Sequence, residues 1–257
     1  MPDTSPALRR ERRSTRAELR HEAIGRLVGP LLRAPGPDGG AALVVDLGGG
    51  AGTLSVELAL LGHDVLVVDP SPDALAALAR RAREAGVGER VRGHQGDARA
   101  LPGLCGGRAV DVMLCHDVLE LVDDPATTLA ELAAAMRPGA SLSLLTAQRS
   151  GAVALRAAVG RVEEALAALS DPDGRTGPDD PLLRRLDADA TAALLGDAGL
   201  DVVEVTGVPV LADLVPEAVL DSSPRARESL RRLELAAADH PDLRGLASHL
   251  HWHAVRR

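Results

Sequence analysis

A hydrophobic run that leads straight into a cluster of glycines constrains the fold of this chain more than any other feature. Residues 42–47 read ALVVDL, the pattern of a buried strand. Four glycines come directly after it: Gly48, Gly49, Gly50 and Gly52. Glycine lets the backbone turn sharply and approach a ligand without a Cβ clash. A buried strand, a glycine turn and a helix that reaches Leu61 therefore predict an α/β sheet whose first loop binds a ligand.

Strand and helix patterns alternate along most of the chain, which favours a mostly parallel sheet with helices on both faces. Strands are predicted at residues 42–47, 64–68, 91–94, 110–115, 141–146, 202–206 and 248–255. Besides the helix after the glycine loop, helices are predicted at residues 7–33, 71–85, 125–136, 151–169, 187–198 and 224–239. The predicted fold class is α/β, with a seven-stranded Rossmann-like sheet.

The chain is predicted to consist of an N-terminal arm and one larger domain. Residues 1–40 hold the first helix and the linker APGPDGG, and residues 41–257 hold the α/β domain. The regular alternation breaks near residues 150–186 and 207–247. We expect these two insertions to form a lid over the substrate.

Composition and charge indicate in which compartment, and with which kinds of partner, the chain is expected to act. No apolar run reaches the length of a membrane span, and Cys105 and Cys115 are the only cysteines, so we expect a cytoplasmic protein without membrane attachment. The formal net charge is −8, although residues 1–33 carry eight arginines against four acids. The acidic body argues against a large nucleic-acid surface, whereas the basic arm leaves room for a small RNA contact.

The spacing of the glycines discriminates between kinds of ligand. A dinucleotide fingerprint G-x-G-x-x-G counted from Gly48 would need glycine where Thr53 stands, and a phosphate-binding P-loop needs a lysine, which this chain lacks. The residues fit D-x-G-x-G-x-G instead, with Asp46 as the acid and Gly48, Gly50 and Gly52 as its glycines. This region resembles the S-adenosylmethionine (SAM) loop of class I methyltransferases.

Three further positions extend this candidate site. Asp69 ends the second predicted strand, where a carboxylate can bind both ribose hydroxyls, and the glycine loop at the correct distance favours this role over a cap of the next helix. Asp97 follows the third strand beside Ala98 and Arg99, where an acid and a backbone amide would read the adenine. The fourth strand delivers His116 and Asp117 to the same edge of the sheet.

Longer segments are similar to the tRNA 5-carboxymethoxyuridine methyltransferase family. They are LVVDLGGGAG, LGHDVLVVDPSPDAL, VDVMLCHDVLELVDDP, MRPGASLSLL and AGLDVVEVTGVPVLADLVP, together with Leu19-Arg20. This resemblance implies a class I methyltransferase acting on a small or nucleoside-like acceptor, such as a carboxylate-bearing wobble uridine of tRNA. It also implies that SAM is contacted by Arg20, Gly48, Gly49, Asp69, Ala98, Arg99 and His116.

Methyl transfer from SAM needs little from the protein beyond positioning, because the sulfonium is already activated. A carboxylate acceptor needs no general base, whereas an amine or a hydroxyl would want one, with His116 and Asp117 as the nearest candidates. His249, His251 and His253 alternate and would share one face of a strand, but no acid or cysteine accompanies them at metal spacing, so no metal site is expected. A SAM-binding protein without turnover remains the alternative, and the glycine spacing disfavours a dehydrogenase-like protein.

Overall fold

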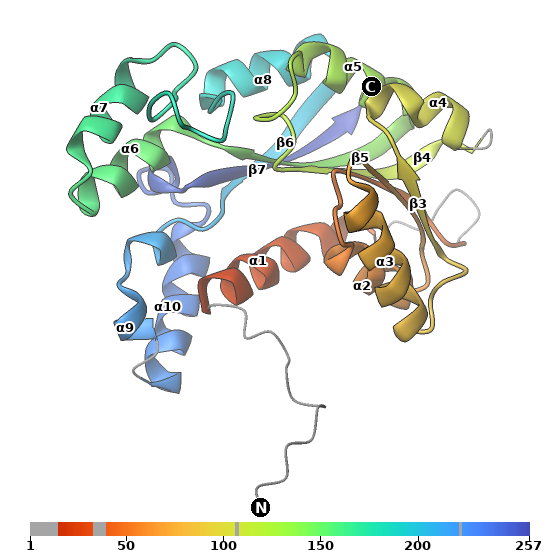
Figure 1. Cartoon of the computed structure of the whole chain (residues 1–257), viewed down its shortest axis with the longest axis horizontal. Coiled ribbons are helices and arrows are strands. Elements are labelled where there is room, and N and C mark those ends of the chain that lie inside the picture. The colour runs from red at the N-terminus through yellow and green to blue at the C-terminus, as the bar shows by residue number, and fades with distance from the viewer. Residues whose placement is uncertain (1–14, 33–39, 106–107, 221–222) are drawn as a thin grey trace, which may run out of the picture.

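The computed structural model describes residues 15–32, 40–105, 108–220 and 223–257. Their core is a seven-stranded sheet in the order β3-β2-β1-β4-β5-β7-β6 (Figure 1). The strands are β1 (Leu43–Leu47), β2 (Asp64–Asp69), β3 (Val91–Gln95), β4 (Val110–His116), β5 (Met136–Ala147), β6 (Leu200–Gly207) and β7 (His249–Arg256). Strand β7 pairs antiparallel with both of its neighbours, β5 and β6, and runs opposite to the other strands of this sheet. The predicted seven-stranded, mostly parallel sheet is confirmed.

Helices cover both faces of the sheet (Figure 1). On one face, α1 (Thr15–Leu31), α2 (Thr53–Leu60) and α3 (Pro72–Glu84) pack against the strand side chains that include Val44 and Val67. On the other face, α4 (Leu101–Leu104), α5 (Pro125–Ala135) and α8 (Ala188–Asp197) pack against a set that includes Val45. Neighbouring valines of β1 thus point to opposite faces, as the pleat of a strand requires, and both faces are buried.

The order of strands locates the binding edge of the sheet. The chain leaves β1 toward β2 on one side and later returns to β4 on the other side of β1. At such a switch point the two connections diverge and leave a crevice beyond the carboxyl ends of the strands. The loops after β1 and β4 therefore flank one crevice, and these loops contain the glycine cluster and Asp117.

Three predicted elements differ in extent. The helix predicted at 151–169 is two helices, α6 (Arg149–Ala158) and α7 (Val162–Ser170), because Gly160 adopts φ 78° between them. The strand predicted at 141–146 begins earlier, since β5 starts at Met136 and its register against β4 shifts around residues 137–140, which makes its first part a bulged strand. Of the helix predicted at 7–33, residues 7–14 and 33 lie outside the described part.

The two insertions lie at the β7 and β6 side of the sheet. The first holds α6 and α7, and the second holds α9 (Glu217–Leu220) and α10 (Pro224–Ala237). Leu19 of α1 packs against Leu220 and Leu230, so the second insertion is joined to the N-terminal helix (Figure 1). Within the described residues, no helix is long and apolar enough to cross a membrane. The two cysteines, Cys105 and Cys115, are buried and free.

Candidate active site

The glycine loop after β1 uses the conformational freedom that its sequence provides. Gly48, Gly50 and Gly52 all have positive φ, at 72°, 55° and 70°. A Cβ on Gly52 would lie 2.0 Å from Cδ1 of Leu78, so this glycine also allows α2 to begin close to α3. The loop is thus built for a tight strand-to-helix turn in which side chains would be strained or would clash.

Asp46 is buried against the glycine loop and stabilises it. It is 5% exposed, and the hydroxyl of Ser55 donates a hydrogen bond to its Oδ2. Burial raises the pKa of Asp46 to about 6. A Cβ on Gly49 would lie 2.5 Å from Oδ2 of Asp46, so the acid and the loop backbone are in close contact. Asp46 therefore contributes to the site by holding the loop rather than by lining the cavity.

Asp69 links the end of β2 to two backbone segments. Its Oδ2 accepts a hydrogen bond from the backbone N–H of Gly50 over 2.9 Å, and its Oδ1 accepts one from Ser71 over 2.8 Å. Ser71, not Asp69, is the N-cap of α3, since its hydroxyl accepts from Ala74. A carboxylate has about four lone-pair sites, so Asp69 can still accept hydrogen bonds from a ligand.

The turn after β3 completes this side of the crevice. Asp97 caps a short helical turn by accepting from the backbone N–H of Arg99 over 3.0 Å, and Ala98 is buried. The N–H of Gly96 donates to the carbonyl of Asp69 over 3.2 Å, which fixes the turn against the end of β2. The side chain of Arg99 is 79% exposed and lies 3.5 Å from Asp97.

A cavity of about 650 Å³ lies at this edge of the sheet. Of the predicted site residues, those that line it are Gly48, Asp69, Asp97, Ala98, Arg99 and Asp117. Sequence reasoning missed its opposite wall, formed by the β4–α5 connection and the start of α5: Val118, Leu121, Val122, Asp123, Asp124, Thr127, Thr128 and Glu131. Arg99 is the only basic residue among the described lining, so the cavity is acidic and favours a cationic group.

Asp117, which lines the cavity, forms an ion pair with Arg20, which does not line it. Arg20 reaches from α1 and donates to both carboxylate oxygens of Asp117, over 2.7 and 2.5 Å. Asp117 has φ 58°, the left-handed conformation that aspartate tolerates better than most residues. The Nε of Arg20 is buried and has no hydrogen-bond partner among the described residues.

His116 lies behind the cavity rather than on its wall. Its Nε2 contacts the hydroxyl of Ser143 at 2.8 Å, and the same hydroxyl contacts Nε2 of His251 at 2.7 Å. Burial lowers the pKa of His116 to about 4 and that of His251 to about 3. Both rings are therefore neutral at pH 7, and His116 is engaged in a hydrogen-bonded row across β4, β5 and β7.

Three arginines near the first insertion are bonded to the chain itself. Arg149 donates to the carbonyls of Asp171 and Pro172, and Arg184 donates to those of Leu119 and Asp123. Arg185 is 8% exposed and pairs with Asp180 at 2.5 Å. These guanidiniums hold the loop between α7 and α8 in place.

The fold and the glycine site define the class of this protein. Residues 44–139 match the family described as "Methyltransferase domain", a segment that runs from β1 into β5. The chain belongs to the class I SAM-dependent methyltransferases, and SAM is its cofactor.

Among characterised relatives, the chain is similar to the tRNA 5-carboxymethoxyuridine methyltransferase of Escherichia coli. The two are 28% identical over 79% of this chain and 76% of the relative. It is also 31% identical to the ubiquinone biosynthesis O-methyltransferase of Burkholderia pseudomallei, over 64% of this chain and 67% of the relative. Methyltransferases with different acceptors are therefore related to this chain.

Solved structures show the same fold. A magnesium protoporphyrin IX methyltransferase from Synechocystis with bound S-adenosylhomocysteine (SAH) aligns with a TM-score of 0.59 and 18% identity, over 100% of this chain and 90% of that one. A [4+2]-cyclase aligns with a TM-score of 0.58 and 18% identity, over 91% of this chain and 82% of that one. The architecture alone thus does not determine the acceptor.

Proposed function

We propose that the chain transfers the methyl group of SAM to a carboxylate oxygen of a nucleoside-like acceptor, of the kind found in a modified wobble uridine of tRNA. The observation that carries this proposal is the similarity to the tRNA 5-carboxymethoxyuridine methyltransferase of Escherichia coli, which extends over 79% of the chain. The second relative is named an O-methyltransferase, which also favours an oxygen acceptor. A tRNA acceptor is consistent with the cytoplasmic location expected from composition.

We assign the acidic cavity to the cofactor. Asp69 would accept hydrogen bonds from the ribose hydroxyls, while Asp97, Ala98 and Arg99 would contact the adenine. Gly48 would allow the backbone to lie against SAM, since a Cβ there would already meet Val118 at 2.4 Å. The acidic lining would stabilise the positively charged sulfonium. The cofactor supplies an activated methyl group when bound.

Arg20 would bind the carboxylate of SAM through its guanidinium, which also pairs with Asp117. A guanidinium presents several N–H groups in one plane, so it can serve two carboxylates at once. The loop would also depend on residues that do not contact SAM directly. Its shape requires Gly49, Gly50 and Gly52, and Asp46 would stabilise that shape. His116 does not line the cavity, so we propose that it acts indirectly, by fixing the strand that carries Asp117.

The chemistry of the acceptor fits the side chains at the crevice. A carboxylate has no proton to lose, so its methylation requires alignment with the sulfonium and exclusion of water rather than a base. Asp117 is held by Arg20 and His116 is neutral and bonded to Ser143, so neither is poised as a free general base. These contacts support a carboxylate rather than an amine or an un-ionised hydroxyl as the acceptor.

Recognition of a base in this chain cannot use phenylalanine or tyrosine, because the sequence contains neither. The single tryptophan, Trp252, is 2% exposed in β7 and donates to the hydroxyl of Thr146. Leu121 is 54% exposed at the cavity and offers an aliphatic surface instead. We therefore expect weaker base stacking than an aromatic side chain would give.

The experiment uses SAM labelled in its methyl group with two acceptor pools, bulk tRNA from cells that lack the wobble methyl ester and a small-molecule extract. We expect the label to appear in a tRNA nucleoside and to be released from it by mild alkali. Methyl esters hydrolyse in base, whereas methyl ethers and methylamines do not. Base-stable label, or label only in the small-molecule pool, would contradict the proposed acceptor. Heat-denatured protein serves as the control.

A further inference from the structure

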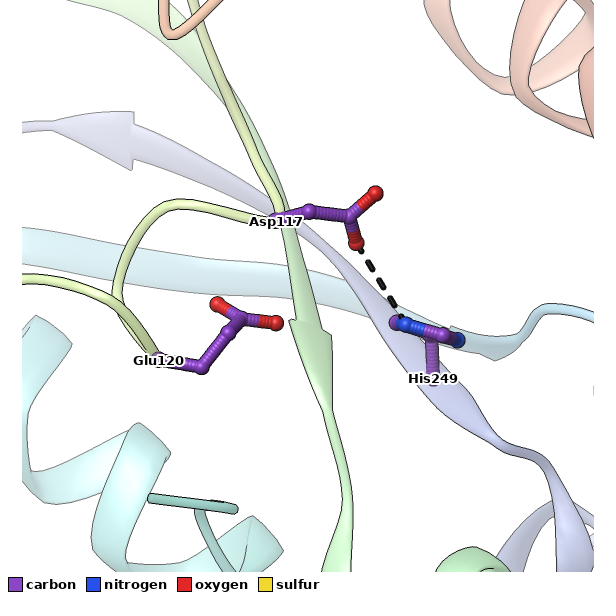
Figure 2. Close-up of side chains that lie close together, drawn as sticks. All are labelled: Asp117, Glu120 and His249. Atoms are coloured by element: carbon purple, nitrogen blue, oxygen red, sulfur yellow. Dashed lines mark ion pairs between the residues drawn. The ribbon is translucent and has the colours of Figure 1, made fainter. Parts of the chain in front are cut away.

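Three side chains with metal-binding chemistry meet beside the cavity: Asp117, Glu120 and His249 (Figure 2). Asp117 directly follows β4, Glu120 lies in the same connection, and His249 is the first residue of β7. One ligand atom from each residue lies within 4.8 Å of the other two. Figure 2 shows an oxygen of Glu120 directed toward the facing side chains of Asp117 and His249.

Glu120 is buried with an unsatisfied oxygen. The side chain is 2% exposed, and its Oε1 accepts a hydrogen bond from the backbone N–H of Ala147 over 2.8 Å. Its Oε2 is buried and has no hydrogen-bond partner. Burial raises the pKa of Glu120 to about 7. A buried carboxylate oxygen without a donor is unfavourable unless a proton or a cation balances it.

The hydrogen bonds around His249 determine which ring nitrogen is free. The hydroxyl of Ser248 donates to Oδ2 of Asp213 over 2.7 Å, so it must accept from Nδ1 of His249, which lies 3.2 Å away. The network thus assigns the proton to Nδ1 and leaves a lone pair on Nε2.

The free lone pair of His249 faces another acceptor. Its Nε2 lies 3.4 Å from Oδ1 of Asp117, and both atoms can only accept in the assigned tautomer. Two facing acceptors repel unless a positive charge lies between them. Arg20 contacts Asp117, but no hydrogen bond in the described part of the chain joins it to His249 or to Oε2 of Glu120. The cluster therefore has unsatisfied acceptors that point at one another.

We propose that Asp117, Glu120 and His249 bind a divalent first-row transition-metal ion, such as Mn²⁺ or Zn²⁺. One imidazole with two carboxylates is a donor set that both ions accept. Metal–ligand bonds of about 2.0–2.2 Å would require the three side chains to move slightly closer together. Oδ1 of Asp117 would bind the metal while Oδ2 keeps Arg20, and Ser248 would orient the imidazole through Nδ1.

The site would open toward the cavity, because Asp117 is one of the cavity-lining residues. The remaining coordination positions would take water or an anionic oxygen of the acceptor, which the ion would hold without receiving a proton from it. The sequence alone predicted no metal site. His249 was considered only with His251 and His253, and those two rings contact Ser143 and Ser141 instead.

Metal binding can be tested without SAM or any acceptor, so the result does not depend on the proposed function. The full chain, stripped with a chelator, is titrated with Mn²⁺, and free Mn²⁺ is measured by electron paramagnetic resonance. We expect binding of about one equivalent that Zn²⁺ displaces. Glu120→Gln and His249→Asn should each weaken Mn²⁺ binding by at least about tenfold.

Two matched controls separate the cluster from general effects. Asp73→Asn changes an exposed acid on α3 outside the cavity, and His253→Asn changes a histidine on the same face of β7, so both should keep wild-type affinity for Mn²⁺. Circular dichroism shows whether each variant folds. If Glu120→Gln or His249→Asn does not fold, Asp117→Asn takes its place as the cluster variant. Failure of the wild-type chain to bind either ion would overturn the proposal. So would equal affinity in the cluster variants and the controls.

Discussion

The carboxylate of Asp69 accepts a hydrogen bond from the backbone N–H of Gly50 over 2.9 Å, so the end of β2 holds the loop that follows β1. Its other oxygen accepts from Ser71 and fixes the start of α3. One side chain thus joins the two connections that form one wall of the crevice. The shape of the loop and the proposed ribose contact depend on the same residue.

Gly52→Ala should destabilise the chain more than Gly50→Ala. Both glycines have positive φ, but a Cβ on Gly52 would meet Leu78 at 2.0 Å, whereas none of the neighbouring atoms lies within 4 Å of a Cβ on Gly50. Backbone strain alone is worth about 1–2 kcal/mol, and overpacking adds about 1–3 kcal/mol. Urea unfolding of both variants measures the difference, and equal losses would contradict the packing described for Leu78.

Asp46→Asn should change how stability depends on pH. The pKa of Asp46 is raised from 3.8 to about 6, so between these values the folded chain keeps a proton that the unfolded chain has lost. The free energy of unfolding contributed by this group is therefore highest below pH 4 and falls as the pH rises to 6. Linkage gives an upper limit of about 3 kcal/mol for this fall.

The matched measurement compares wild type and Asp46→Asn by urea unfolding at two pH values, near 4.5 and near 7.5. Other titrating groups are shared by both chains, so they cancel in the difference. The variant should gain stability relative to wild type at the higher pH, since an amide can still accept from Ser55. A difference that does not change with pH would show that Asp46 titrates normally.

Two glycine-to-alanine changes in helices should have opposite effects. A Cβ on Gly151 in α6 would lie 1.9 Å from the carbonyl oxygen of Ala247, which is backbone and cannot rotate away. Gly151→Ala should therefore cost about 3 kcal/mol. Gly196 in α8 has open space around it, and Gly196→Ala should add about 0.5–1 kcal/mol. Thermal unfolding of both variants measures whether each change lowers or raises stability. A Gly151→Ala variant as stable as wild type would contradict the close contact of α6 with residues 247–248.

Local sequence patterns were sufficient to predict the core of the fold. Strands β1, β2 and β4 are short, mostly apolar runs that end in a polar residue or lead into a glycine, and both faces of β1 are covered, so a continuous hydrophobic run was the correct signal. The positions of Gly48 and Asp69 at strand ends also follow from sequence, because parallel strands bring their carboxyl ends to one edge. The position of the cavity that they line could therefore be predicted from the sequence, but its shape could not.

Contacts between distant segments were not predictable from the sequence. The pairing of Arg20 with Asp117 joins α1 to the end of β4, and the cluster with Glu120 forms only because β7 lies antiparallel beside β5. No local spacing indicates either contact. The break between α6 and α7 was missed for a different reason, since Gly160 lies in an otherwise continuous helical pattern.

Calorimetric titration with SAM and SAH tests most directly whether the cavity beside the glycine loop is the cofactor site. Wild type should bind about one equivalent, and Asp69→Ala should lose at least about 100-fold in affinity, since it removes both the proposed ribose acceptor and the contact to Gly50. Asp69→Asn, which keeps an acceptor oxygen, should lose less, and Asp73→Ala on α3 should bind as wild type does. A folded Asp69→Ala variant with unchanged affinity for SAM and SAH would contradict the assignment of the cavity.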